Sequence, residues 1–227
     1  MRFHTFYTTD LPLELIEDHK KVCNKIGIEV IYHSQKPSKE YNDNYTAHGK
    51  FMTSVMEQEE VACFLDIDCL PHNLKNLEKA YNWAIENKSF IGNAQNITFT
   101  EMKHYVFAGP CFLIVTRDAW NTLGSPDFSW FVQNGQQIDT AQILTLRAYE
   151  IGMEYQLMYP IGYDGPEIYK LSGYGRYGTG TLYPATWHYF RLSRFKEKLP
   201  SIWKTRVNNI LEGREIIPNY SSCFYEL

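Results

Sequence analysis

Residues 62–70, with the sequence ACFLDIDCL, place two aspartates one residue apart at the end of an apolar run. The run predicts a buried strand, and the alternation of side chains along a strand puts Asp66 and Asp68 on one side, with Ile67 on the other. Adjacent carboxylates repel each other and lose hydration, and a divalent cation removes both penalties. Hard cations such as Mg²⁺ and Mn²⁺ prefer oxygen ligands and keep positions open for phosphates. The stretch therefore predicts a metal and phosphate site at the carboxyl end of a strand.

The segments around this stretch alternate between strand-like and helix-like patterns. The expected strands cover residues 2–9, 28–33, 61–66, 90–97, 106–116 and 155–159. The expected helices cover residues 11–25, 45–59, 74–87, 118–123 and 138–151, and Thr9-Asp10 and Asn73 are expected to cap the first and third of them. This alternation predicts an α/β fold with a mixed, mainly parallel sheet flanked by helices. Ligands of such sheets bind beyond the carboxyl ends of the strands, where Asp66 and Asp68 fall.

The composition is that of one soluble globular domain. A chain of 227 residues, 44% hydrophobic and 21% charged, is long enough to bury a full core. Its net charge of −4 argues against nucleic acid as the main ligand. The five cysteines lack zinc-type spacing, which favours a reducing compartment. The sequence shows no secretory leader and no apolar run of membrane-spanning length, so a cytoplasmic location is expected.

Two later segments depart from the alternating pattern. Residues 162–180 hold six glycines and four tyrosines, which predicts either a mobile lid or an ordinary surface loop. Residues 191–214 carry seven Lys or Arg and two Glu among apolar residues, and Pro200 divides them into two helical pieces. We expect residues 191–227 to form a C-terminal extension that packs on the domain of residues 1–190. Its basic face indicates either a solvated helix pair or peripheral membrane contact.

In its order of motifs the chain resembles the GT-A glycosyltransferases, which have a Rossmann-like fold, an Asp-X-Asp motif and nucleotide-sugar donors. The resemblance covers roughly residues 2–190, and the layout is similar to the compact GT-A domains of large algal viruses. The apolar strand before Asp66-Ile67-Asp68 looks like the motif strand of that family. Three further similarities are the strand end Tyr7-Thr8-Thr9, the small-residue strand VFAGPCFLI of residues 106–114, and the sequence QQID of residues 136–139. His188, late in the chain, matches the position of a third metal ligand.

The resemblance implies a metal-dependent transfer of a sugar from a nucleoside-diphosphate sugar, with a UDP-sugar favoured, to a hydroxyl of a glycan or other acceptor. Asp66, Asp68 and His188 would hold Mn²⁺ or Mg²⁺, and Asp66 would bind the ribose or share the metal through water. Asp139 would accept the acceptor's proton in an inverting reaction, or stabilise positive charge in a retaining one.

The same resemblance implies contacts to the rest of the donor. Thr8, Thr9 and Lys50 are candidates for contacts to the base, ribose or phosphate. Gly109 would let the backbone approach the sugar closely.

The candidate residues also have purely structural interpretations. Asp68 can cap a turn, Asp139 can cap its helix, and His188 can be a packed histidine of an aromatic cluster. Lys50 can lie on a solvated helix face, and Gly109 can mark a bulge.

Two other functions remain open. An apolar strand ending in Asp-X-Asp also occurs in haloacid-dehalogenase-type phosphatases, so the chain could be a metal-dependent phosphohydrolase. In that family a Thr or Val follows two residues after the second Asp, whereas Leu70 stands here, and a full strand–helix–strand unit precedes the motif. The third interpretation is a nucleotide-sugar-binding module without catalysis.

Overall fold

The computed structural model describes residues 1–39, 41–96, 106–171, 176–190, 192 and 199–221. Its centre is a six-stranded sheet with the order β2-β1-β3-β6-β5-β9. The strands are β1 (Arg2–Thr8), β2 (Glu29–Gln35), β3 (Val61–Leu65), β5 (Phe90–Asn96), β6 (Val106–Thr116) and β9 (Gln156–Met158). The β1–β2, β1–β3 and β5–β9 pairs are parallel, and β6 runs antiparallel to β3 and β5. The predicted mixed, mainly parallel sheet is confirmed.

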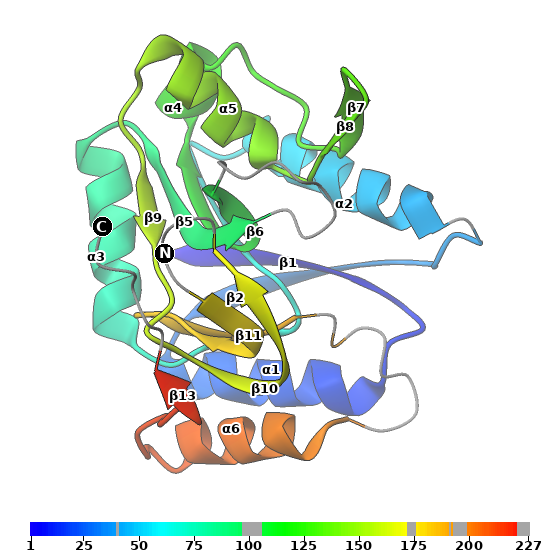
Figure 1. The fold of residues 1–227 in the computed structure, drawn as a ribbon, viewed down its shortest axis with the longest axis vertical. Helices are drawn as coiled ribbons and strands as arrows, with labels where there is room; N and C mark the ends of the chain where they lie inside the picture. Colours follow the sequence, from blue (N-terminus) through cyan, green and yellow to red (C-terminus); the bar gives the residue numbers. More distant parts are fainter. Residues whose placement is uncertain (40, 97–105, 172–175, 191, 193–198, 222–227) are drawn as a thin grey trace.

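Helices cover both faces of this sheet (Figure 1). They are α1 (Leu13–Ile26), α2 (Tyr41–Met56), α3 (Leu74–Glu86), α4 (Arg117–Thr122) and α5 (Gln142–Ile151). The side chains of β3 alternate between the faces: Ala62 and Phe64 pack with α2, α4 and α5, whereas Cys63 and Leu65 pack with α1 and α3. The apolar run before the aspartates is therefore buried on both sides, as parallel strands between helical layers generally are.

The predicted helix starts were wrong for α1 and α2. α1 begins at Leu13 after Pro12, whose fixed φ of −54° suits the entry to a helix, so Thr9 and Asp10 do not cap it. α2 begins at Tyr41, four residues before the expected start at residue 45, and ends at Met56. α3 is capped as predicted, since the side chain of Asn73 accepts a hydrogen bond from the amide of Asn76 at 3.1 Å. In the part of the chain that the structure describes, the helices are all too short or too polar to cross a membrane.

A second, antiparallel sheet has the order β13-β10-β11-β12-β4. Its strands are β4 (Cys69–Pro71), β10 (Gly162–Lys170), β11 (Arg176–Leu182), β12 (Thr186–Tyr189) and β13 (Tyr220–Ser221). β4 follows β3 directly after residues 66–68, so one short turn joins the two sheets.

Residues 162–170 and 176–180 of the glycine-rich segment form the hairpin β10–β11, so the predicted surface loop is wrong there, and the lid stays a prediction. The glycines of these strands make room for aromatic rings. A Cβ on Gly178 would lie 2.9 Å from Cδ2 of Tyr163, and a Cβ on Gly180 would lie 2.8 Å from Cζ2 of Trp187. Glycine in these strands therefore allows close packing of the core, which composition alone did not reveal.

The C-terminal helix α6 (Ser201–Leu211) begins after Pro200, as predicted, and packs on α1 through Trp203 and Val207. The first predicted helical piece lies mostly outside the described residues. A buried ion pair ties α6 to β10. Asp164 accepts hydrogen bonds from Nη2 of Arg206 at 2.7 Å and from Nε at 3.1 Å, and another from Nε1 of Trp187 at 3.0 Å.

Replacing Arg206 by alanine should lower the free energy of unfolding by about 3–5 kcal/mol, because the carboxylate of Asp164 would stay buried without its partner. Urea denaturation followed by tryptophan fluorescence measures this. The matched control is Arg214→Ala, which removes an arginine paired with Glu212 at the surface and should cost at most about 1 kcal/mol. Equal losses in the two variants would show that the buried pair does not anchor the helix.

Candidate active site

Asp66 and Asp68 lie in the turn between β3 and β4, because β3 ends at Leu65. The backbone amide of Cys69 closes this turn by donating to the carbonyl of Asp66 at 2.9 Å. The alternation of a strand is therefore not what brings the carboxylates together, and that part of the prediction is wrong. The turn brings the two carboxylates together instead. One ligand atom from each of Asp66, Asp68 and His188 lies within 4.8 Å of the other two.

His188 reaches the turn through the pairing of β12 with β4. It lies opposite Cys69 in the antiparallel register, and the next amide, that of Tyr189, donates to the carbonyl of Asp68 at 2.9 Å. Nε2 of His188 lies 3.4 Å from Oδ1 of Asp68, and both residues are buried. The fold thus places the three predicted metal ligands together.

The electrostatics of this group favour a cation. Burial, and then the charge of Asp68, raise the pKa of Asp66 well above its usual range. Burial alone would lower the pKa of His188, but the neighbouring Cys111 and Asp68 outweigh it and raise the pKa well above its usual value. Two carboxylates and one imidazole form a donor set for a divalent cation, and the nitrogen suits Mn²⁺ better than Mg²⁺. The residues present therefore fit the predicted metal.

Replacing His188 by alanine should weaken Mn²⁺ binding by about 10-fold or more and Mg²⁺ binding by less than about 3-fold, because Mg²⁺ depends mainly on oxygen ligands. Calorimetric titration of each ion measures the two affinities. An equal loss for both ions would contradict a role for the imidazole as a ligand.

Two residues that sequence reasoning did not select also contact this group. Nε2 of His48, on α2, lies 3.4 Å from Oδ1 of Asp66, and its ring stacks on Phe6 with the centroids 5.4 Å apart. Burial lowers the pKa of His48 to about 4, so the ring is neutral at pH 7. The carbonyl of Cys111 accepts the amide of Asp66 at 3.0 Å. His48 belongs to no motif, and Cys111 lies within the small-residue strand of residues 106–114, but the placing of both depends on contacts distant in sequence.

Cys111 is buried, but its surroundings are polar. Its sulfur accepts hydrogen bonds from Nε2 of Gln95 at 3.2 Å and from Nδ2 of Asn93 at 3.5 Å. Burial alone would raise the pKa of the thiol, but a hydrogen bond with Cys69 and the charge of His188 lower it to about 5.

A bulge in β6 brings this cysteine to the turn. The pairing with β5 jumps from Gly92 opposite Leu113 to Asn93 opposite Gly109. A Cβ on Gly109 would lie 2.0 Å from Oε1 of Gln95, so a larger residue here would displace that side chain from its present position beside the bulge. The structure thus supports the interpretation of Gly109 as part of a bulge. Its contact with a sugar stays a prediction.

Asp139 precedes α5 and does not cap it, because the helix begins at Gln142 and Ala141 stands before it with a φ of 61°. The predicted helix start at Ile138 is wrong, since the hairpin of β7 (Phe131–Gln133) and β8 (Gln136–Ile138) takes up the preceding residues. The carboxylate of Asp139 accepts the amide of Thr140 at 2.8 Å. Burial raises the pKa of Asp139. The charge of Asp139 in turn contributes to the raised pKa of Asp66.

Two residues close to Asp139 in the sequence carry buried polar atoms without partners. Among the described residues, the buried Nε2 of Gln142 and Oγ1 of Thr140 have no hydrogen-bond partner. Oε1 of Gln142 accepts the amide of Asp139 at 2.8 Å, which fixes the amide group of the side chain. Buried polar groups are nearly always satisfied, so an unsatisfied pair beside a carboxylate is a place where a polar ligand would bind.

The remaining predicted residues are Thr8, Thr9 and Lys50. Thr8 ends β1 half-buried, and Thr9 is exposed. Lys50 is exposed on α2 and lines a hollow of about 620 Å³ together with Phe6, Phe51, His33 and Ser34. The ring of Phe6, which lines the hollow, stacks on His48, and His48 in turn contacts Asp66.

No family model and no curated protein matches the chain. Solved structures do match it. The galactosyltransferase LgtC in complex with donor and acceptor sugar analogues is 9% identical over 96% of this chain and 98% of that chain, with a TM-score of 0.49. The Drosophila β-1,4-galactosyltransferase 7, as a mutant in complex with manganese, UDP-Gal and xylobiose, is 12% identical over 88% and 81%, with a TM-score of 0.42.

A third match is a glycosyltransferase involved in the glycosylation of the major capsid of PBCV-1. It is 13% identical over 70% of this chain and 80% of that chain, with a TM-score of 0.42. At these scores the likeness assigns no role to any residue. All three are described as glycosyltransferases.

Proposed function

We propose that the protein is a metal-dependent glycosyltransferase of the GT-A type, which moves a sugar from a nucleoside-diphosphate sugar to a hydroxyl acceptor. The observation that carries the proposal is the meeting of Asp66, Asp68 and His188 directly after β3, at the carboxyl end of the parallel pair β1–β3. Ligands of α/β sheets bind at this edge. A divalent cation held there would neutralise the charge of the departing diphosphate.

The chain's own residues supply the other functions. The hollow beside Phe6 and Phe51 offers aromatic walls for a nucleobase, and Lys50 at its edge offers a charge for a phosphate. Asp139 is the candidate for accepting the acceptor's proton or for stabilising positive charge at the sugar. A UDP-sugar is the favoured donor, and contacts of Thr8, Thr9 and Gly109 with the ribose, phosphate or sugar belong to the same proposal.

We further propose that residues 1–190 form the transferase domain and that residues 191–227 pack on it. The packing of α6 on α1 supports this arrangement. Lys204 and Arg206 pair with Asp18 and Asp164, so these two cations of the basic segment serve internal contacts and do not favour a membrane surface.

Incubation with Mn²⁺ and a panel of nucleotide sugars tests the function. Release of nucleoside diphosphate that stops on chelation of the metal is the expected result. Release of phosphate from simple monophosphate esters would instead favour a phosphohydrolase. Binding of nucleotide sugars without any turnover, with and without glycan acceptors, would favour a binding module.

A further inference from the structure

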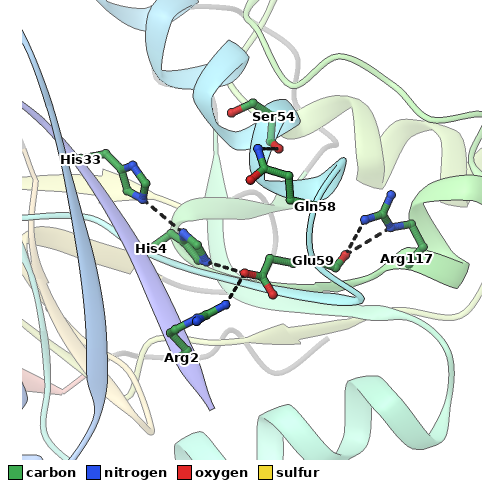
Figure 2. Close-up of polar contacts among 7 residues, drawn as sticks. All are labelled: Arg2, His4, His33, Ser54, Gln58, Glu59 and Arg117. Carbon is green, nitrogen blue, oxygen red and sulfur yellow. Dashed lines mark hydrogen bonds and ion pairs between the residues drawn. The ribbon is translucent and has the colours of Figure 1, made fainter.

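Three polar side chains, those of Glu59, His4 and His33, follow one another in a chain of contacts (Figure 2). Glu59 follows α2, His4 lies in β1 and His33 in β2. Nε2 of His4 lies 3.6 Å from Oε1 of Glu59, and its Nδ1 lies 3.3 Å from Nε2 of His33. His33 forms part of the wall of the hollow. The carboxylate is thus connected to the hollow through two imidazole rings.

Both ends of this chain are held in place. Oε1 of Glu59 pairs with Nη2 of Arg2 at 2.5 Å, and the carbonyl of Glu59 accepts hydrogen bonds from Nη2 of Arg117 at 2.9 Å and from Nε at 3.2 Å. The ring of His33 stacks on His4 with the centroids 5.5 Å apart and contacts Phe51 at 4.6 Å. The orientation of each ring is therefore set by packing.

The carboxylate determines where the hydrogens of the two rings lie. Its negative charge favours the hydrogen of His4 on Nε2, although 3.6 Å is too long for a hydrogen bond. Nδ1 of a neutral His4 then accepts, so Nε2 of His33 must donate. Burial lowers the pKa of His4 and of His33, which keeps both rings neutral near pH 7. Nδ1 of His33 is left with a lone pair.

We propose that His33 determines which nucleobase binds: its Nδ1 accepts a hydrogen bond from a ring N–H, as uracil and guanine carry, with His4 and Glu59 as positioning residues. The inference rests on the proposed function, because it places the base in the hollow. Cytosine and adenine carry an accepting ring nitrogen at the corresponding position, which would face the lone pair of His33. Glu59 thus acts through His4 to set the hydrogen position of His33, and that hydrogen position selects the base.

The hydrogen positions can be observed without any ligand. In protein labelled with ¹⁵N-histidine, long-range ¹H–¹⁵N spectra should show His4 and His33 with the hydrogen on Nε2. Glu59→Gln should allow the reverse tautomer of both rings, because an amide can donate as well as accept. The matched control Glu60→Gln changes the same charge at an exposed neighbour and should leave the spectra unchanged. A hydrogen on Nδ1 of His33 in the unmodified protein would overturn the proposal.

Calorimetry with Mn²⁺ then tests base selection, using UDP, N3-methyl-UDP, GDP, N1-methyl-GDP and CDP as probes. The methylated form of the base that binds should bind about 10-fold more weakly than its parent. His33→Phe should abolish this difference while leaving Mn²⁺ binding unchanged, and Glu59→Gln should bring the affinities for UDP and CDP closer together.

The outcomes separate the two proposals. Full discrimination by His33→Phe would overturn the role of His33 and leave the proposed function standing. If none of the nucleotides binds to the unmodified protein, the proposed function fails, and the assignment of His33 fails with it.

Discussion

Asp68→Ala should lower the affinity for UDP in the presence of Mn²⁺ by more than about 100-fold, since even the outer-shell partners of metal sites contribute 10–100-fold. Asp68 is buried beside His188 at the centre of the ligand group, so its removal leaves only one carboxylate to hold the charge. Calorimetric titration measures the loss. Circular dichroism should show an unchanged fold, because the backbone bonds of the turn do not involve this side chain.

The matched control for this experiment is Asp118→Ala. Asp118 lies on α4 with an exposed side chain that pairs with Lys88, so the variant makes the same chemical change at a surface site. It should bind UDP and Mn²⁺ as the unmodified protein does. Unchanged affinity in Asp68→Ala would contradict the metal assignment.

Asp139→Asn should reduce sugar transfer by about 10²–10⁴-fold while the affinity for the donor stays within about 2-fold, because the role proposed for the carboxylate is at the reacting groups and not at the diphosphate. Steady-state transfer rates and a donor titration measure the two effects separately. Equal transfer rates in both proteins would remove Asp139 from the mechanism.

The pH dependence gives an independent check of this role. Burial raises the pKa of Asp139, and the group works as a base only when ionised. The rate of transfer should therefore be maximal above this raised pKa and should fall as the pH drops through it. This fall should occur at a higher pH than it would for an ordinary carboxyl group. The pH profile of Asp139→Asn should lack this fall in rate on the acidic side. If the rate of the variant falls at the same pH, the fall must be due to the titration of another group.

The sequence predicted those features that depend on local pattern. The apolar run into Asp66 specified a buried strand, and the alternation of strands and helices specified the sheet. It did not predict the turn that joins Asp66 to Asp68, because one backbone hydrogen bond from Cys69 decides between a turn and a continued strand. The sequence also did not predict the packing of Gly178 and Gly180, because the aromatic rings that pack against them belong to other strands.

The partners of the site were hidden for the same reason. His33 and His48 lie in ordinary amphipathic segments, and nothing local distinguishes them from surface histidines. Only the parallel pairing of β1 with β2 puts His4 next to His33, and only the packing of α2 on β1 puts His48 on Phe6. Contacts between residues distant in sequence require the fold to be known.

The turn between β3 and β4 also fixes when the site can first exist. Asp66 and Asp68 belong to the first part of the chain, whereas His188 comes from β12, near its end. During synthesis the first sheet can form around β1 and β3 long before β12 leaves the ribosome. A nascent or truncated chain would therefore hold its two aspartates without the imidazole of His188, and full cation affinity would report that both sheets have been assembled.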